Sequence, residues 1–306
     1  MKYDEQTIKD IVDMKQNGVG SRLIAELFGI SKSGVNEAYY RFMLEQMKSL
    51  EHSKNYLHEE QAFNKHPAVL FIDLETAPDI AAVFGRRKQN IGQDAVIQEG
   101  GWIISAAWKW LGDKQVRSQV LSSSEAKNQD DYTLCWVIYE LLNKADAVVA
   151  HNGQRFDLPL IRARLAKHDF GPHKKVKVID TLRIARQMRF QSNKLDSLGV
   201  TLGCGRKQKH SGISLWIDCM NGDQNALNTM QEYNKQDIVL LEQVYHKLKA
   251  FDNHAPNLGL FYEDNLNRCF VCGSENLEET GHIVSTAMQK YEEVSCLDCG
   301  ARSRKK

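Results

Sequence analysis

The sequence lacks any hydrophobic run near the ~20 residues that would span a bilayer, and its first five residues do not begin a signal peptide. It also lacks internal repeats, low-complexity segments and a net charge of one sign, since 40 basic and 39 acidic residues leave only +1. These absences argue against a membrane partner and predict a cytoplasmic protein. Any surface that binds nucleic acid must therefore be a local basic patch.

The 306 residues, 42% hydrophobic and 26% charged, suit a globular protein with one large domain and small appendages. Strand and helix patterns alternate over the middle of the chain, which favours an α/β mixed sheet with an antiparallel part. The predicted strands are 68–74, 101–109, 115–121, 146–150 and 176–179, and the predicted helices are 130–143, 156–168, 180–189 and 224–250. The predicted units are a helical module at 1–50, a linker at 51–66, the α/β domain at 67–250, a connector at 251–268 and a cysteine-bearing tail at 269–306.

Acidic residues lie on one predicted strand and one predicted helix of this middle region, where burial is expected. Asp73 and Glu75 end the apolar run 68–72, and because they are two apart on a strand they point to the same face. Tyr233 and Asp237 are four apart on a predicted helix, so they also share a face. The sequence therefore predicts carboxylates facing inward from a strand and a helix.

Asp157, at the end of the block 151–157, is the fourth acid of this kind. Gathering four carboxylates costs several kcal/mol unless cations neutralise them. Hard oxygen ligands without His or Cys select Mg²⁺ or Mn²⁺. Two such ions held by carboxylates catalyse in-line phosphodiester hydrolysis, so the pattern indicates a nuclease.

Three motifs in this order resemble the DEDD superfamily of 3′→5′ exonucleases: Asp73-x-Glu75, Asn152-x3-Phe156-Asp157 and Tyr233-x3-Asp237. Tyr233 is typical of the DEDDy branch. The region 67–250 is similar to the proofreading exonuclease domains of family B DNA polymerases and to stand-alone versions of them. Segments 178–181 and 194–199 lie where that group has a strand end and a short helix. The resemblance implies a ribonuclease H-like fold with flanking helices.

The resemblance also implies roles for five residues. Asp73, Glu75, Asp157 and Asp237 would hold two Mg²⁺ or Mn²⁺ ions around the scissile phosphate, with Asp73 as the ligand shared between the ions. Tyr233 would hydrogen-bond the attacking water, because a phenol with a pKa near ~10 is mostly protonated at neutral pH. A tyrosine that only packs in the core is the alternative.

Neighbouring residues carry weaker expectations. Asn152 either hydrogen-bonds the terminal nucleotide or caps the helix that carries Asp157. His151 is expected to be structural, since a hard-metal site needs no histidine. Three tryptophans at even positions share one strand face and should pack in the core: Trp102, Trp108 and Trp110.

The loop 203–210 precedes the last predicted helix and combines two glycines with a cluster of cations. Arg206, Lys207 and Lys209 suit contact with a phosphate backbone near the site. The alternative is a solvated loop without function.

Four cysteines in two Cys-x2-Cys pairs form the second strong pattern: Cys269, Cys272, Cys296 and Cys299. A glycine after each pair allows a tight turn, and four thiolates at this spacing suit one structural Zn²⁺ in a zinc ribbon. The basic residues of 302–306 weakly favour nucleic acid over a protein as the ribbon's partner. The other cysteines, Cys135, Cys204 and Cys219, are expected to be core or incidental thiols.

The segment 21–35 fits a helix-turn-helix, with Ala25 allowing close helix approach, Gly29 making the turn and Val35 packing the second helix. Four residues would then face duplex DNA: Lys32, Ser33, Asn36 and Arg41. Seven basic and seven acidic residues in 1–50 suit phosphate binding poorly. The alternative is a helical module that docks on the nuclease or on a partner.

Together these patterns predict a metal-dependent 3′→5′ exonuclease with single-stranded DNA as its favoured substrate. No polymerase domain follows in the sequence, so we do not expect a self-contained proofreading polymerase. We expect an enzyme of a bacterium or its phage that edits for a separate polymerase, trims ends in repair or recombination beside a repair partner, or degrades invading DNA. The alternatives are an RNA-trimming enzyme and, in another class, a nucleic-acid-binding regulator or assembly factor.

Overall fold

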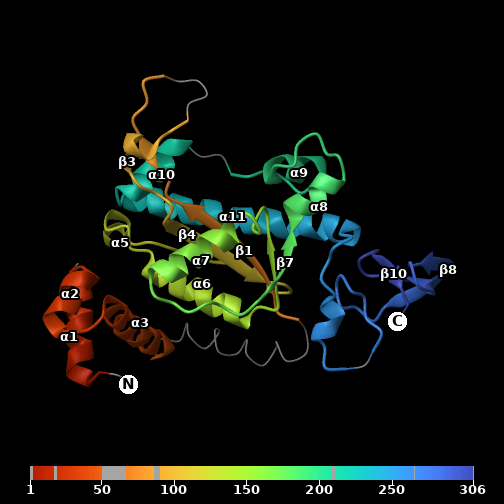
Figure 1. Ribbon diagram of the computed structural model, residues 1–306, viewed down its shortest axis with the longest axis horizontal. Coiled ribbons are helices and arrows are strands. Elements are labelled where there is room, and N and C mark those ends of the chain that lie inside the picture. The colour runs from red at the N-terminus through yellow and green to blue at the C-terminus, as the bar shows by residue number, and fades with distance from the viewer. Residues whose placement is uncertain are drawn as a thin grey trace.

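The computed structural model describes residues 3–16, 19–49, 67–85, 90–208, 211–264 and 266–305. A five-stranded sheet with helices on both faces forms the centre, small helices lie at the N-terminal end, and a β-hairpin unit lies at the C-terminal end (Figure 1). The predicted α/β class with a mixed sheet is confirmed.

The sheet has the strand order β5-β4-β1-β6-β7, so β1, first in sequence, is central. β1 pairs antiparallel with β4 and parallel with β6, β4 pairs antiparallel with β5, and β6 pairs parallel with β7. All five predicted strands are confirmed: β1 (Val69–Thr76), β4 (Ile103–Trp110), β5 (Arg117–Val120), β6 (Ala147–Ala150) and β7 (Lys177–Asp180).

The four predicted helices and the short helix near residue 195 are also confirmed. They are α6 (Tyr132–Lys144), α7 (Asp157–Lys167), α8 (Thr181–Gln187), α9 (Leu195–Thr201) and α11 (Gln224–Leu248). The prediction missed short elements whose length gives little periodicity: the hairpin β2 (Ile80–Ala81) and β3 (Val96–Gln98), the 3₁₀ helix η4 (Gln93–Ala95), α5 (Ser123–Lys127) and α10 (Ile213–Met220).

The two faces of β1 pack in different clusters, and α11 contributes its N-terminal half to one and its C-terminal half to the other. Even-numbered Leu70 and Ile72 pack in one cluster with α6 and α7, and the three tryptophans join this cluster as predicted. Odd-numbered Val69 and Phe71 pack in a second cluster with α8, α9 and the C-terminal half of α11. Because side chains alternate along a strand, the next odd residues, Asp73 and Glu75, point to the side of α11.

The N-terminal helices are α1 (Glu5–Gln16), α2 (Ser21–Phe28) and α3 (Lys32–Ser49). Their own core contains Ala25 and Val35, and Gly29 ends α2 with a φ of 62°, while the helix-turn-helix assignment remains a prediction. α3 packs against α6 of the α/β domain, and Lys15 forms an ion pair with Asp130 at 3.7 Å (Figure 1). The module is thus docked on the α/β domain.

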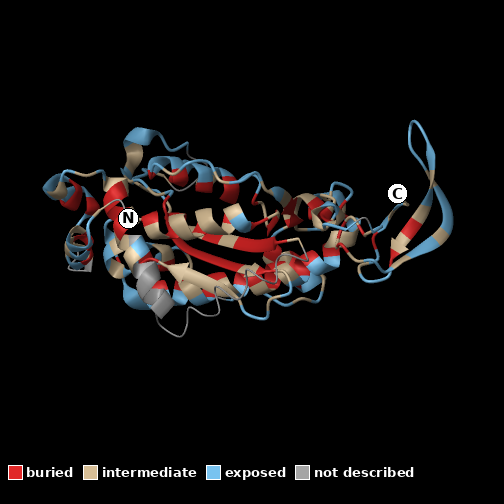
Figure 2. Ribbon diagram, turned by 90° about the horizontal axis from the view of Figure 1, so that it is seen from below, coloured by how far each residue is buried: buried red, intermediate tan, exposed pale blue. Residues whose placement is uncertain are grey.

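The C-terminal part begins with the 3₁₀ helices η5 (Lys249–Phe251) and η6 (Leu258–Phe261), followed by β8 (Leu277–Ser285), β9 (Lys290–Cys296) and β10 (Arg302–Arg304). The three strands form a sheet of order β10-β9-β8. Figure 2 shows the β8–β9 hairpin extending away from the α/β domain, with mostly exposed residues. The amide of Leu258 donates to the carbonyl of Phe270 at 2.7 Å, which ties η6 to the first cysteine pair.

Asp131, fully buried just before α6, holds β4 and α7 together. Its carboxylate accepts from Nε and Nη2 of Arg164 at 2.7 and 2.5 Å, from the amide of Ile103 at 2.8 Å, and lies 2.6 Å from Nε2 of His168. Burial alone would raise the pKa of Asp131, but the hydrogen bonds from His168 and Arg164 outweigh it and lower the pKa to about 2. The carboxylate is therefore ionised in the folded protein above that pH.

We expect Asp131→Asn to lower the free energy of unfolding by about 3 kcal/mol at pH 7, because it leaves the Arg164 guanidinium buried without its counter-charge. Since the folded pKa lies below the unfolded value near ~3.9, the contribution is present above pH ~4 and is lost as pH falls toward 2. Urea denaturation of both proteins between pH 3 and pH 7 measures it. Asp113→Asn, at the more exposed pair with Arg117, is the control and should cost under about 1 kcal/mol. Equal losses at the two positions would contradict the role of Asp131.

Candidate active site

Three of the four predicted acids converge at the end of β1. Carboxylate oxygens of Asp73, Glu75 and Asp237 lie within 4.8 Å of one another. Asp157, the first residue of α7, is buried and lies outside this group of three, yet its charge raises the pKa of both Asp73 and Glu75. The structure therefore gathers all four acids in one region, with Asp157 at its edge.

Asn234 holds Asp73 in place, a role that the sequence analysis did not predict. Its Nδ2 donates to Oδ2 of Asp73 at 2.7 Å and to the Asp73 carbonyl at 3.3 Å. Its Oδ1 accepts from Oγ of Ser105 on β4 at 3.0 Å. Asn234 stands beside Tyr233 and three residues before Asp237, so helix periodicity already placed it on the same face of α11.

Three of these carboxylates, Asp73, Glu75 and Asp157, have raised pKa values. Burial, followed by the charges of Asp237, Glu75 and Asp157, raises the pKa of Asp73 well above its ordinary value. Burial and then the charge of Asp237 raise the pKa of Glu75 to about 7, and burial is also the main cause that raises the pKa of Asp157 to about 7. The predicted electrostatic cost of gathering these groups is therefore present.

The donor set fits a hard divalent cation. Asp73, Glu75 and Asp237 supply only oxygen atoms, and no His or Cys belongs to this cluster among the described residues. A doubly charged cation relieves the repulsion between the carboxylates and replaces the water that burial removes. We conclude that these three residues are a candidate cation site, with Asp157 beside it.

Tyr233 is buried on the face of α11 that carries Asp237. Burial and then the charge of Asp237 raise its pKa to about 12, so the phenol is protonated at neutral pH. Its ring meets the ring of Trp216 edge-to-face at 6.2 Å. Trp216 also donates from Nε1 to Oε2 of Glu75 at 3.2 Å. Sequence reasoning missed Trp216 because it lies on α10, a helix of eight residues that was not predicted.

The loop between β6 and α7 is held by Asp180. Asp180 accepts from the amides of Asn152 at 2.9 Å and Gln154 at 3.3 Å, and it caps α8. Phe156 occupies the N-cap position of α7 and no side chain caps this helix end, so the expectation that the Asn152 side chain caps it is wrong, and the contact of Asn152 with a nucleotide remains a prediction. Nδ1 of His151 lies 2.9 Å from Oγ1 of Thr181, and its Nε2 lies 3.0 Å from the carbonyl oxygen of Asn193, which confirms its structural role.

The basic loop contributes one side chain to the site. Nζ of Lys207 donates to Oδ2 of Asp237 at 2.5 Å and to the Tyr233 hydroxyl at 3.2 Å. Arg206 is exposed, and Lys209 lies outside the described residues. Phosphate contact by these three residues remains a prediction.

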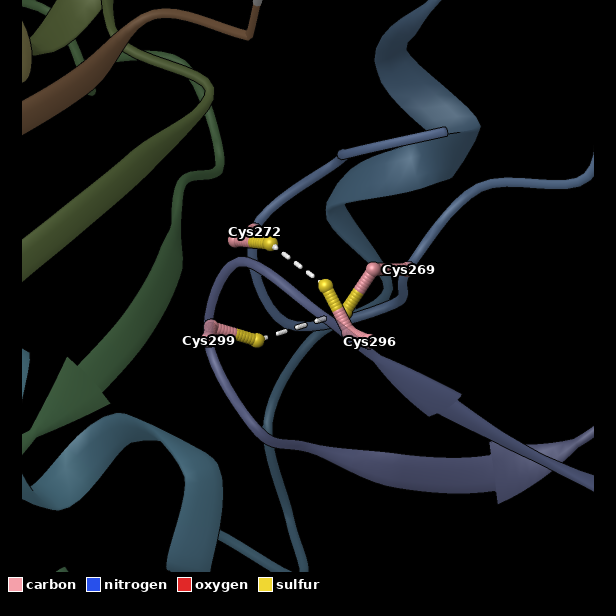
Figure 3. Close-up of side chains that lie close together, drawn as sticks. All are labelled: Cys269, Cys272, Cys296 and Cys299. Atoms are coloured by element: carbon pink, nitrogen blue, oxygen red, sulfur yellow. Dashed lines mark hydrogen bonds between the residues drawn. The ribbon is translucent and has the colours of Figure 1, made fainter. Parts of the chain in front are cut away.

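The four predicted zinc ligands converge in the C-terminal part. Sulfur atoms of Cys269, Cys272, Cys296 and Cys299 lie within 4.8 Å of one another, and Figure 3 shows the side chains pointing to a common centre. Gly273 and Gly300, which follow the two pairs, both have a φ of 76°, as the predicted turns require. The cluster fits a zinc ribbon. Cys135 and Cys219 are buried core thiols, as predicted, and Cys204 is partly buried.

Two basic residues of the tail, Arg302 and Lys305, are paired within the ribbon itself. Lys305 pairs with Glu279 and, at 3.1 Å, with Glu292, while Arg302 lies 3.7 Å from Glu293. Carboxylates beside these cations weaken their attraction for phosphate. The pairing therefore weakens the expectation that these two residues bind nucleic acid, and the ribbon's partner remains a prediction.

The residues predicted to face duplex DNA divide into two groups. Asn36 is only 3% exposed and accepts a hydrogen bond from Oγ of Ser21 at 2.5 Å, so the expectation that it faces DNA is wrong. A polar side chain that bonds the neighbouring helix stabilises the module instead. Lys32 and Ser33 are partly exposed, and Arg41 is exposed but pairs with Glu37 at 2.7 Å.

The comparison with protein families matches residues 99–249 to the RNase H superfamily. This segment has an RNase H-like fold. The match begins after β1, which completes the sheet and supplies Asp73 and Glu75. The fold and the acidic cluster, which fits the DEDD arrangement, support a nuclease. Among the described residues, no helix is both long and apolar enough to cross a membrane.

No curated protein matches the chain. Among solved structures, the family B DNA polymerase from the hyperthermophilic archaeon Pyrobaculum calidifontis is similar over 60% of this chain, with 14% identity and a TM-score of 0.44. The similarity covers 25% of the polymerase, so this chain spans about a quarter of that protein's length.

We expect the stability of the zinc-loaded protein without other divalent ions to fall between pH 4.5 and pH 7. Glu75 and Asp157 have folded pKa values of about 7, above the unfolded values near ~4, so the folded state holds more protons in this window. Each group accounts for roughly 3 kcal/mol at most. Urea denaturation across this range should show a shallower slope in Glu75→Gln, and Mn²⁺ should stabilise the wild type more as pH rises. A slope unchanged by Glu75→Gln would contradict the raised pKa of Glu75.

We expect purified protein to contain about one zinc per chain, retained after dialysis that removes Mg²⁺, because thiolates bind zinc far more tightly than carboxylates bind magnesium. Cys296→Ser should release the metal and unfold the β8–β9 hairpin, seen as fast amide exchange there, while α11 stays protected. Cys135→Ser is the control and should keep its zinc. Zinc-free protein whose four thiols react freely with iodoacetamide in the folded state would exclude the ribbon.

Proposed function

We propose that this protein is a metal-dependent 3′→5′ exonuclease that hydrolyses single-stranded DNA from its 3′ end with two Mg²⁺ or Mn²⁺ ions. One observation carries the proposal: oxygens of Asp73, Glu75 and Asp237 converge within 4.8 Å, on the face of α11 that also carries Tyr233. A protein that only binds nucleic acid gains nothing from clustered carboxylates, which repel phosphate.

Different residues of the site have different roles in the proposed reaction. Asp73, Glu75 and Asp237 hold the cations, and Asp157 completes the ligand set from α7. When bound, the two divalent ions lower the pKa of the attacking water and stabilise charge on the leaving 3′-oxygen. Tyr233 stays protonated at neutral pH and therefore orients that water through a hydrogen bond rather than acting as a base.

Neighbouring side chains keep the ligands in place before substrate arrives. Asn234 holds one oxygen of Asp73, and Trp216 holds one oxygen of Glu75. These bonds come from α11 and α10, so two helices fix the two acids of β1. Such preorganisation lowers the cost of assembling the site at the moment of reaction.

Recognition of the DNA end falls to the loops around the site. Asn152 lies between β6 and α7, near Asp157, and Arg206 is exposed on the loop that brings Lys207 to Asp237. These positions suit contacts with the last nucleotides and their phosphates. The helical module and the ribbon, whose cations are largely paired, would then contact a protein partner such as a polymerase or repair factor.

We expect Asp73→Asn to reduce hydrolysis of 5′-labelled single-stranded DNA about a thousandfold or more, because it removes a cation ligand while keeping the side-chain shape. Tyr233→Phe should cost less, about ten- to a hundredfold, because the ligand set stays complete. Wild-type products should form a descending ladder that requires Mg²⁺ or Mn²⁺.

Glu232→Gln is the matched control for this assay, since Glu232 adjoins Tyr233 on α11 but points to solvent and pairs with Lys235 at 2.6 Å. It should retain wild-type activity. Parallel digestion of duplex DNA and of RNA defines the substrate class, and a stronger preference for RNA would replace DNA in the proposal. Activity that survives EDTA, or full activity in Asp73→Asn, would refute the metal-dependent mechanism.

A further inference from the structure

Lys207 lies against one of the carboxylates that would hold a divalent cation. The Lys207 ammonium lies 2.5 Å from Oδ2 of Asp237, one of the three converging ligands. A cation bound to that oxygen at about 2.1 Å would lie no more than about 4.6 Å from the ammonium. Repulsion at that distance is strong in a partly buried site, so the two positive charges exclude one another.

The Lys207 ammonium is hydrogen-bonded within the site, and the Lys207 side chain also reaches solvent. It bonds Asp237 and the Tyr233 hydroxyl and lies 5.3 Å from the centre of the Tyr233 ring, yet the side chain is 31% exposed. The backbone amide of Lys207 donates to Oδ1 of Asp196 on α9 at 2.8 Å. A rotation of the side chain alone, with the backbone anchored, therefore carries the charge away from Asp237.

The glycines before Lys207 shape this approach. Gly203 and Gly205 have φ values of 70° and 110°, a region that other residues rarely adopt. They turn the chain back from α9 so that Lys207 reaches α11. Burial alone would lower the pKa of Lys207, but the charges of Asp237 and Asp73 raise it, so the group stays an ammonium.

We propose that Lys207 is an exchangeable internal counter-ion that neutralises Asp237 until a divalent cation binds and then rotates out of the site. The proposal rests on the proposed function, because it assigns the cations to the same carboxylates. Lys207 is then a positioning residue that sets how much metal the enzyme needs. This role differs from a direct contact with substrate phosphate, which requires no change in metal affinity.

The test is Mn²⁺ binding to the full, zinc-loaded chain without DNA, followed by the loss of the free-ion signal in electron paramagnetic resonance at pH 8. Lys207→Gln should bind Mn²⁺ at least about tenfold more tightly than the wild type, since one repelling charge is gone. Lys207→Arg should keep the weaker affinity, because it keeps the charge. Lys235→Gln removes a charge on α11 that pairs with exposed Glu232, and should bind as the wild type does.

Thermal unfolding gives a second readout. Without added Mn²⁺, Lys207→Gln should melt at a lower temperature than the wild type, because Asp237 loses its counter-charge, and Mn²⁺ should raise its melting temperature by more. Equal Mn²⁺ affinity in Lys207→Gln and the wild type, with an increased KM for DNA, would show a phosphate-binding lysine and overturn the exchange. Mn²⁺ binding that Asp73→Asn leaves unchanged would instead overturn the cation site and the proposed function with it.

Discussion

The burial of carboxylates at the end of β1 is the constraint on which the site depends. Val69 and Phe71 of β1 pack with α11 in one apolar cluster, and the same strand face continues into Asp73. The hydrophobic contact that stabilises the sheet therefore also brings Asp73 close to Asp237, whatever their repulsion costs. Because the apolar packing is extensive, the acids can stay together with raised pKa values instead of separating.

Three hydrogen bonds convert this constraint into a defined geometry. Asn234 holds Asp73 from α11, Trp216 holds Glu75 from α10, and Lys207 holds Asp237 from the loop after α9. Each partner comes from a different segment, so the geometry of the acids depends on how all three segments pack. A change in α10 or in the loop would alter ligand geometry without touching a ligand, which is how distant substitutions reduce catalysis.

Local patterns sufficed for the acids, the cysteines and the order of strands and helices. Asp73 and Glu75 end an apolar run, and period-two alternation fixes their common face. The contact between Lys207 and Asp237, by contrast, joins residues 30 apart through a loop without periodicity. The burial of Asn36 depends on how α3 meets Ser21 of α2, and Trp216 lies on a helix too short to predict. Tertiary packing, which a single sequence does not encode locally, decided these cases.

Charge balance links the number of cations to Lys207. Four ionised carboxylates carry a charge of −4, and the Lys207 ammonium leaves −3, so this lysine alone cannot neutralise the site. Two divalent cations would bring the four acids to neutrality only if the ammonium leaves; if it stayed, the buried site would carry a net positive charge. Since uncompensated charge of either sign is costly in a partly buried site, exchange of Lys207 for metal is the arrangement that electrostatics favours.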